Sequence, residues 1–405
     1  MCSLFMLFTL PMTVLKIIFW LCLTIVFYTY IGYGLVLYLL VVLKRLLKGR
    51  KHVPSVTDDN LPQMTLMICA YNEEDIIREK MENIRQLNYP REKLCIMWVT
   101  DGSDDHSNEL LSKYPEVTLV YSPERCGKAA AIQHGINENK APFVVFTDAN
   151  TMLNANAIRI IAQLFMDERI GCVSGEKRVK ARVAGETAAE GEGLYWKYES
   201  TLKRWDSELY SAMGAAGELF AIRMSVYCEA PSNALLDDFM MSMLILKNGH
   251  RIAYTSEAYA MEYGSANMEE ESKRKRRIAA GGLQSSWWLR SMMNPLRHPI
   301  IAFQFVSHRV LRWSITPFCM LALLLTNILL TILTTDCVFY IILTMQALLY
   351  AAAVGEWLAA KWGHKPIKLL HVPYYFLFMN INVFRGIAYL RTHRHSGTWE
   401  KAKRG

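Results

Sequence analysis

Acidic and amide side chains gather in short polar clusters, each close behind an apolar run of the chain. The clusters are Asn72-Glu73-Glu74, Asp101-Gly102-Ser103-Asp104-Asp105, Gly127-Lys128 and Asp148-Ala149-Asn150. Divalent metals such as Mg²⁺ prefer oxygen ligands and are commonly held by one or two carboxylates together with substrate phosphates. Asp148, with Asn150 as a neutral oxygen donor, therefore suits a metal that neutralises a diphosphate leaving group.

Each cluster also has an ordinary structural explanation when it is taken alone. Asn72 followed by two glutamates suits a helix N-cap and its first turn. The Asp101 cluster suits a capped turn, and Lys128 suits a solvated side chain. All the clusters occur at the ends of predicted strands, and this shared placement favours one common site instead. In that site Asp101 would receive the base or ribose of a nucleoside, and Lys128 would contact phosphate or base.

The elements that must position these clusters are short apolar strands separated by helical patterns. The strands are predicted over 64–69, 94–100, 117–121 and 143–147. Such alternation is typical of an α/β fold with a parallel, doubly wound sheet. Ligands of these sheets bind outside the carboxyl ends of the strands, which is where all the polar clusters fall.

Together, the ordered motifs resemble those of the family 2 glycosyltransferases with the GT-A (Rossmann-like) fold. The motifs are Ala70-Tyr71-Asn72-Glu73, Thr100-Asp101-Gly102-Ser103-Asp104, Gly127-Lys128-Ala129 and Thr147-Asp148-Ala149-Asn150. The resemblance is to membrane-embedded cellulose, chitin, hyaluronan and poly-N-acetylglucosamine synthases, and it covers residues 66 to about 284. It implies a nucleotide-sugar donor, expected to be a UDP-sugar, and Mg²⁺ or Mn²⁺ as cofactor. The residues expected to bind the donor are Ala70, Tyr71, Asn72, Glu73, Asp101, Lys128 and Asp148.

A further acidic pair, Asp237-Asp238, begins a helix that is predicted to end near Lys247. The pair is either an acidic helix start or a source of the general base, because inversion at an anomeric carbon needs a carboxylate opposite the leaving group. The resemblance aligns Asp238 with the final Asp of the family's Thr-Glu-Asp motif, which is the base. Asp237 takes the place of the Glu and is expected to raise the pKa of its neighbour.

The resemblance also implies roles for two more segments of the chain. The small-residue loop that ends in Gly217-Glu218 matches a family loop near the acceptor sugar, so both residues are expected acceptor contacts. The basic run Lys273–Ile278 aligns with the Gln-x-x-Arg-Trp motif of processive members, but Arg274 and Ile278 replace the Gln and the Trp. Arg277 matches the Arg of the motif and is expected to bind the diphosphate. The alternative is that the basic run is a loop that faces anionic lipid.

Apolar residues make up 52% of the chain and are concentrated at its two ends. Residues 17–43 exceed the roughly 20 residues needed to cross a bilayer, and a basic cluster follows them. The positive-inside rule then places the N-terminus outside and the next domain in the cytoplasm. Two C-terminal stretches, 315–334 and 337–360, are also long enough to span.

The segment 369–390 is either interfacial or re-entrant, or it crosses the membrane with polar residues lining a conduit. Its polar residues favour a crossing. The stretch up to Trp313, including His308-Arg309-Val310-Leu311-Arg312, is predicted to be interfacial. The expected divisions are an N-terminal transmembrane helix with its basic flank (1–50), a linker (51–63), a GT-A domain (64–290), an interfacial region (291–313), transmembrane segments (314–391) and a basic tail (392–405).

These features predict an inverting glycosyltransferase of the plasma or inner membrane that extends a polysaccharide at the cytoplasmic face, with coupling to export. The altered Gln-x-x-Arg-Trp motif leaves open a non-processive transferase that acts on a lipid-linked sugar. A non-catalytic glycan-export subunit is a third alternative. No Gly-x-Gly-x-x-Gly follows the first strand, which disfavours a dinucleotide-dependent oxidoreductase. The expected partners are the donor, a glycan or lipid-linked acceptor, the bilayer and accessory subunits, without nucleic acid.

Overall fold

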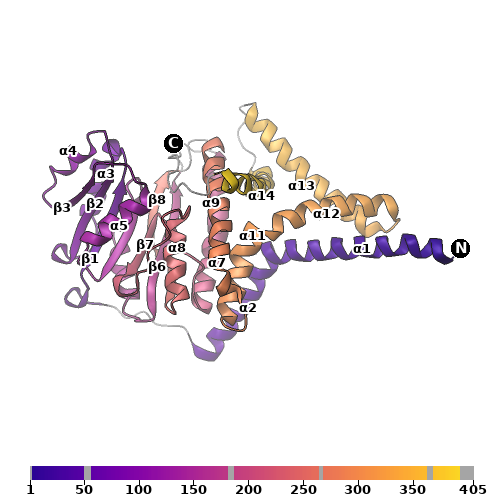
Figure 1. The fold of residues 1–405 in the computed structure, drawn as a ribbon, viewed down its shortest axis with the longest axis horizontal. Helices are drawn as coiled ribbons and strands as arrows, with labels where there is room; N and C mark the ends of the chain where they lie inside the picture. The colour runs from indigo at the N-terminus through magenta and orange to yellow at the C-terminus, as the bar shows by residue number, and fades with distance from the viewer. Residues whose placement is uncertain (1, 50–55, 181–186, 264–267, 363–367, 393–405) are drawn as a thin grey trace.

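The computed structural model describes residues 2–49, 56–180, 187–263, 268–362 and 368–392, and it joins a mixed α/β domain to long apolar helices (Figure 1). Residues 393–405 of the predicted basic tail and residues 51–55 of the predicted linker lie outside these described residues. The α/β class and the flanking apolar helices agree with the prediction.

One eight-stranded sheet crosses the domain in the order β3-β2-β1-β4-β7-β6-β8-β5. The strands are β1 (Met64–Ala70), β2 (Leu94–Asp101), β3 (Val117–Ser122), β4 (Phe143–Asp148), β5 (Met152–Leu153), β6 (Ile170–Lys180), β7 (Leu219–Arg223) and β8 (Arg251–Tyr263). The first four strands pair in parallel, as predicted. β7 pairs antiparallel with both β4 and β6, and β5 antiparallel with β8. The four predicted strands thus form the parallel part of the sheet, and the sheet continues as a mixed one in which β6 and β8 pair in parallel.

The antiparallel direction of β7 follows from where its preceding loop lies. Thr147, near the end of β4, is paired with Leu219 at the start of β7. The loop before Leu219 thus reaches the carboxyl edge of the parallel strands, and β7 must run back from that edge. This reversal brings Gly217 and Glu218 to the edge where Asp148 ends its strand.

Two layers of helices cover the sheet. Side chains of a strand alternate between its faces. On one face Met67 and Val99 pack with α5 (Lys128–Glu138) and α8 (Asp237–Lys247). On the other face Ile68 and Trp98 pack with α3 (Glu74–Arg85) and α6 (Ala157–Leu164). Both α5 and α8 begin at the carboxyl edge of the sheet, so their first residues face the same space.

Further helices stand between the sheet and the apolar helices (Figure 1). The longer ones are α7 (Thr187–Leu209) and α9 (Met268–Trp288), and the shorter ones are α10 (Pro299–Phe305) and α11 (Leu311–Trp313). The short helix α4 (Ser107–Leu111) lies at the opposite end of the domain, where it contacts α3 and β3. Short 3₁₀ turns occupy Asp58–Asn60, Arg91–Lys93, Met224–Val226 and Arg290–Met293, and a π-helical turn occupies Val306–Val310.

The N-terminal helix changes direction at a π-helical turn, Tyr28–Gly32, which joins α1 (Cys2–Phe27) to α2 (Tyr33–Lys48) (Figure 1). α1 packs along α12 (Ile315–Leu333), whereas α2 packs on α7. Arg45 forms an ion pair with Glu208 at 2.5 Å, and Lys44 donates to the backbone carbonyl of the same residue at 2.6 Å. The basic end of this helix is therefore attached to the α/β domain.

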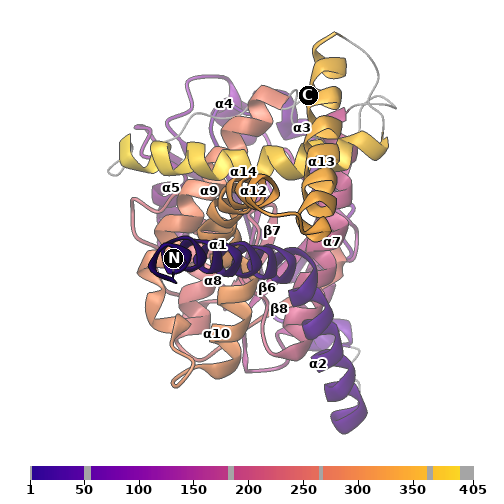
Figure 2. The same ribbon diagram turned by 90° about the vertical axis from the view of Figure 1, so that its right-hand side faces the viewer.

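Within the described residues, three stretches are long and apolar enough to cross a membrane: Met12–Lys48, Ile315–Leu333 and Cys337–Lys361. The last of these is α13. The final helix, α14 (Lys368–Thr392), is not among them. It runs across α1 and α12 and packs on α9 (Figures 1 and 2).

Candidate functional site

A cavity of about 1150 Å³ opens between the carboxyl edge of the parallel strands and helices α8, α9 and α14. It brings together nearly all of the residues predicted for the site. Those that line it are Ala70, Tyr71, Glu73, Asp101, Lys128, Asp148, Asn150, Gly217, Glu218, Asp237, Asp238 and Arg277. The common site inferred from strand-end position thus exists as a single space, although the role of each residue remains a prediction.

Asn72 is the predicted site residue that does not line the cavity. Its backbone has a φ of 51°, a left-handed conformation that asparagine tolerates better than most residues. Its side-chain amide donates to Oδ1 of Asp104 at 2.5 Å and accepts from the backbone N–H of Asp104 at 3.1 Å. Asn72 therefore joins two loops at the edge of the sheet and positions its neighbours Tyr71 and Glu73.

Asp101 ends β2 with its carboxylate almost completely buried. The two carboxylate oxygens accept hydrogen bonds from the backbone N–H groups of Cys126 and Gly127, at 2.8 and 2.7 Å. At the adjacent Gly102, φ is +66° and an added Cβ would come within 2.5 Å of the backbone nitrogen of Arg125. Asp101 thus holds the loop that leads into Lys128, while it also lines the cavity.

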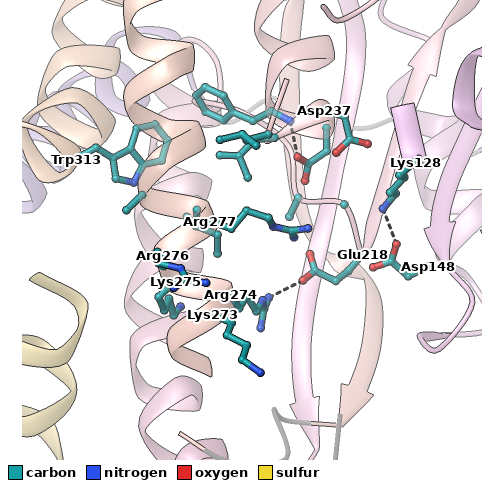
Figure 3. Close-up of a pocket in the computed structure, with 18 of the residues that line it drawn as sticks. Lys128, Asp148, Glu218, Asp237, Lys273, Arg274, Lys275, Arg276, Arg277 and Trp313 are labelled. Carbon is teal, nitrogen blue, oxygen red and sulfur yellow. Dashed lines mark hydrogen bonds and ion pairs between the residues drawn. The ribbon is translucent and has the colours of Figure 1, made fainter. Parts of the chain in front are cut away.

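Lys128 and Asp148 form the central ion pair of the site, with 2.7 Å between Nζ and Oδ1 (Figure 3). Lys128 begins α5 and Asp148 ends β4. Burial lowers the pKa of Lys128, but the carboxylates of Asp148 and Asp237 outweigh that effect and raise the pKa above its ordinary value. The ammonium is therefore charged at neutral pH and places a fixed positive charge beside Asp148.

The acidic pair at the start of α8 faces the same ion pair. The backbone N–H of Phe239 donates to Oδ1 of Asp238 at 2.7 Å. A Cβ added at Gly217 would lie 3.1 Å from Oδ2 of Asp238 and 3.6 Å from Nζ of Lys128. Burial, followed by the neighbouring carboxylate of Asp237, raises the pKa of Asp238 to about 7, against an opposing effect of Lys128. A carboxyl group with such a pKa exchanges a proton near neutral pH, as a general base must.

Glu218, predicted to contact the acceptor, is engaged in ion pairs inside the cavity. Its Oε1 lies 3.0 Å from Nη2 of Arg274 (Figure 3). The same oxygen lies 3.3 Å from Nζ of Lys177, whose side chain is fully buried. The whole run Lys273–Ile278 lines the cavity from within α9, so the alternative of a basic loop facing lipid is wrong. Burial lowers the pKa of Arg277, which lies across the cavity from the acidic pair.

Several cavity residues were predicted to lie elsewhere or were not singled out. His308, Arg309, Arg312 and Trp313 line the cavity instead of lying only at the membrane interface. Trp196, Tyr198, Glu199 and Lys203 line it from α7. Arg309 forms an ion pair with Glu199 at 2.6 Å, and both segments are far from the strand motifs in sequence. The spacing of these residues in the sequence does not predict that they share a cavity, because only the packing of α7 against the turn at 306–310 brings them together.

Beneath the site, Lys80 of α3 is completely buried and supports the end of β4. Its ammonium donates to the carbonyl oxygens of Thr151 at 2.5 Å and Asp148 at 3.0 Å, and to the hydroxyl of Thr147 at 3.2 Å. A lysine within an amphipathic helix resembles a solvated side chain in sequence, so this role was not predicted.

The donor set at the end of β4 fits a metal that takes few ligands from the protein. Within the described residues, no group of three or more His, Cys, Asp or Glu side chains is arranged to hold a metal ion. Asp148 and Asn150 nevertheless face the same cavity and offer a carboxylate and an amide oxygen. Mg²⁺ is often bound by one or two carboxylates while phosphates and water complete its coordination.

Comparison with known proteins points to one family. The model of the family "Glycosyltransferase like family 2" matches residues 62–281. The chain is 30% identical over 131 residues to a poly-beta-1,6-N-acetyl-D-glucosamine synthase of Staphylococcus aureus, a match that covers 31% of each chain. It is 27% identical over 215 residues to the probable glycosyltransferase YdaM of Bacillus subtilis, a match that covers 50% of this chain and 51% of the relative. The matched regions thus span about a third to a half of these relatives.

Among solved structures, the mannosyltransferase PcManGT from Pyrobaculum calidifontis, in complex with GDP-Man and Mn²⁺, has a TM-score of 0.68 and 20% identity to this chain. The likeness covers 94% of this chain and 100% of that structure. The two proteins therefore share a fold that includes the flanking helices as well as the sheet, and the predicted GT-A fold is confirmed.

Proposed function

Because the chain belongs to glycosyltransferase family 2, as its motifs predicted, we propose that it transfers a sugar from a UDP-sugar to a hydroxyl group of a growing glycan at the membrane surface. The observation that carries this proposal is the meeting of Asp238, whose pKa is about 7, with Lys128 and Asp148 in one cavity. A base and a cationic site for a leaving diphosphate are the two requirements of an inverting transfer.

The proposed reaction is a direct displacement at the anomeric carbon. Asp238 accepts the proton of the acceptor hydroxyl while the hydroxyl oxygen forms a bond to that carbon. The bond from the carbon to the diphosphate oxygen breaks, and the nucleoside diphosphate leaves. Lys128 and Arg277 offset the negative charge of the departing group. When bound, Mg²⁺ or Mn²⁺ would be held by Asp148 with Asn150 and would add further neutralisation of the diphosphate.

The orientation in the membrane is also part of the proposal. Lys44 and Arg45, at the basic end of α2, contact the α/β domain at Glu208. If this basic end faces the cytoplasm, the domain over 64–290 is cytoplasmic and the N-terminus lies outside. We place α14 at the interface, beside the spans within 1–50 and 314–391. Export or accessory subunits would act at these helices.

A second candidate is a single transfer to a lipid-linked sugar. It is favoured by Arg274 and Ile278 at the positions of the Gln and Trp of the processive motif, since Arg274 is committed to Glu218. A non-catalytic export subunit is disfavoured, because such a subunit has no need of two neighbouring, partly buried carboxyl groups opposite a lysine.

The test is release of nucleoside diphosphate by the detergent-purified protein with a panel of UDP- and GDP-sugars, with and without Mn²⁺ or a chelator. Asp238→Asn is the inactive variant, and Asp75→Asn, at an exposed position of α3, is its matched control. Turnover with one donor that requires metal and is lost only in Asp238→Asn supports the proposal. Binding of a nucleotide sugar with no turnover under any condition, acceptor membranes included, supports the export subunit.

A further inference from the structure

Helix α14 packs along α9 beside the basic run Lys273–Ile278 (Figure 1). Just before this run, the hydroxyl of Ser272 donates to Oδ1 of Asn382 at 2.8 Å and accepts from Nη1 of Arg385 at 3.0 Å. Asn382 is completely buried. The start of the run is therefore fixed to α14 through a single hydroxyl group that both donates and accepts a hydrogen bond.

The end of the run is fixed to α14 by close backbone packing at Gly386. A Cβ added at Gly386 would lie 2.8 Å from Cβ of Ala279 and 2.9 Å from the backbone nitrogen of Ala280, the two residues that follow the run. These distances are well below the separation of about 3.5–4.0 Å at which carbon atoms make contact. Any side chain at position 386 would therefore push the two helices apart.

Between these two points, residues of the run contact aromatic rings of α14. Nζ of Lys275 lies 5.6 Å from the ring centre of Tyr375, and the guanidinium of Arg276 lies 5.0 Å from that of Tyr389. The hydroxyl of Tyr375 also donates to Glu271, which precedes the run, at 3.0 Å. One side of α9 is thus held against α14 along the whole run.

The opposite side of the same run faces the sheet. An α-helix turns by about 100° per residue, so Arg274 and Arg277 lie together on the side away from Ser272 and Arg276. Arg274 forms an ion pair with Glu218 at 3.0 Å, and Arg277 lies across the cavity from the acidic pair (Figure 3). A displacement of α9 relative to α14 would therefore move Arg277 within the cavity.

Helix α14 is itself attached to the apolar helices. Tyr30, in the π-helical turn between α1 and α2, donates to Oδ1 of Asn380 at 2.7 Å. Nδ1 of His371 lies 3.4 Å from Oε1 of Glu356 in α13, and both side chains are buried. α14 therefore connects these helices to the run that carries Arg277.

We propose that α14 positions the donor-binding side of α9, by holding this helix at the distance from which Arg277 reaches the diphosphate. Ser272 and Gly386 are the positioning residues, because neither lines the cavity and both act through Arg277. A displacement of about 1 Å is enough to weaken such a contact severely. This inference rests on the proposed function, in which Arg277 offsets the charge of the diphosphate.

The experiment measures the Kd of the detergent-purified full chain for UDP and for UMP in the presence of Mn²⁺. Gly386→Ala should raise the Kd for UDP about tenfold and that for UMP less than about twofold, because UMP lacks the second phosphate. Ser272→Ala removes two hydrogen bonds without adding bulk and should act in the same direction. Ser272→Thr keeps the hydroxyl and should bind UDP as the unchanged protein does.

Gly355→Ala is the matched control, because Gly355 also lies within a long helix and a Cβ added there would meet nothing within 4 Å. It should change neither constant. A double variant tests whether Gly386 acts through Arg277. Gly386→Ala combined with Arg277→Gln should bind UDP no more weakly than Arg277→Gln alone, since the contact that Gly386 positions is already lost.

Equal losses of affinity for UDP and UMP in Gly386→Ala would overturn the inference, because they would show general damage to the fold. Additive losses in the double variant, or a Gly386→Ala variant that binds UDP as well as Gly355→Ala does, would overturn it too. An Arg277→Gln variant that keeps full affinity for UDP would instead overturn the proposed role of Arg277. Failure to bind either UDP or GDP would overturn the proposed function itself.

Discussion

Lys128 and Asp148 meet at 2.7 Å across the carboxyl edge of the sheet, so the first residue of α5 is tied to the last residue of β4. Both side chains remain partly exposed to the cavity, at 28% and 26%. A metal ion held by Asp148 would compete with the ammonium of Lys128 for the same carboxylate. Under the proposed function, binding of the donor would therefore change the charge balance of the site at this pair.

Replacement of Lys128 by glutamine tests this balance. We expect kcat/KM for the nucleotide sugar to fall by about 10- to 100-fold, because a cation that offsets charge on the diphosphate is lost. Release of nucleoside diphosphate at varied donor concentration and saturating Mn²⁺ measures the effect. Lys140→Gln, at an exposed position just beyond the end of α5, is the control. Equal kcat/KM in the two variants would show that Lys128 does not act on the donor.

The pH dependence of transfer tests Asp238 as the base. Only the deprotonated carboxylate accepts the proton of the acceptor, and burial with the charge of Asp237 raises the pKa of Asp238 to about 7. The value of kcat/KM should therefore fall about tenfold for each pH unit below that pKa and be level above it. Asp237→Asn removes the like charge, so its acid limb should move to lower pH.

The profile is measured from about pH 5 to pH 9, within which both forms of such a group are populated. Lys128→Gln offers an independent check, since Lys128 lowers the pKa of Asp238 and its loss should move the acid limb to higher pH. A wild-type profile that stays level down to pH 5 would exclude Asp238 as a base with this pKa.

The strands and the polar clusters that follow them could be predicted from sequence because they depend on local patterns. Each strand is a short apolar run, and the carboxyl ends of parallel strands share one edge, so Asp101 and Asp148 had to lie near each other. The start of α8 at Asp237 was also predicted, because acidic residues favour the first helical turn. Local rules therefore suffice for the part of the cavity beside the strand ends.

The part of the cavity beside α7 and the turn at 306–310 could not be predicted, because its residues meet only through long-range packing. Glu199 and Arg309 are separated by more than a hundred positions, and no spacing rule joins a residue of α7 to the turn at 306–310. For the segment 369–390 the sequence left an interfacial or re-entrant helix and a crossing helix both open, because its mixture of apolar and polar residues fits either. The direction of α14 relative to α1 is a property of the tertiary fold, so no local pattern gives it.

Replacement of the buried Lys80 by methionine tests the support under β4. Methionine fills similar space but donates no hydrogen bond, so the carbonyl oxygen of Thr151 loses a buried partner, whereas that of Asp148 still accepts from the hydroxyl of Thr151. We expect the protein to lose about 1–3 kcal/mol of stability for the one acceptor left unpaired. Affinity for Mn²⁺ in the presence of donor should also weaken, because the backbone of Asp148 loses one of its contacts. Thermal unfolding in detergent and a Mn²⁺ titration measure the two effects.

Arg78→Met, at an exposed position on the same helix, is the control for Lys80→Met and should change stability by less than about 0.5 kcal/mol. If the two variants unfold at the same temperature and bind Mn²⁺ equally, Lys80 does not position Asp148.

Replacement of Asp206, a residue of α7, tests how α2 is attached to the rest of the protein. This carboxylate is completely buried and accepts hydrogen bonds from the hydroxyl of Tyr33 and from Nε2 of Gln304, the latter at 2.9 Å. Its other oxygen lies 2.5 Å from Nδ1 of His308. Helices α2, α7 and α10 and the turn at 306–310 thus converge on one carboxylate, which makes it the main polar connection between the N-terminal helix and the cavity wall.

Asp206→Ala should destabilise the protein by about 3–5 kcal/mol, because removal of one member of a buried ion pair leaves its partners unsatisfied. Asp206→Asn should cost less, since its amide oxygen still accepts from Tyr33. In a double-mutant cycle by thermal unfolding, Tyr33→Phe and Asp206→Ala should show a coupling of about 0.5–3 kcal/mol, as expected for residues in contact. If their effects are simply additive, α2 is held to α7 by the partly buried contacts of Arg45 and Lys44 with Glu208, and not by this buried carboxylate.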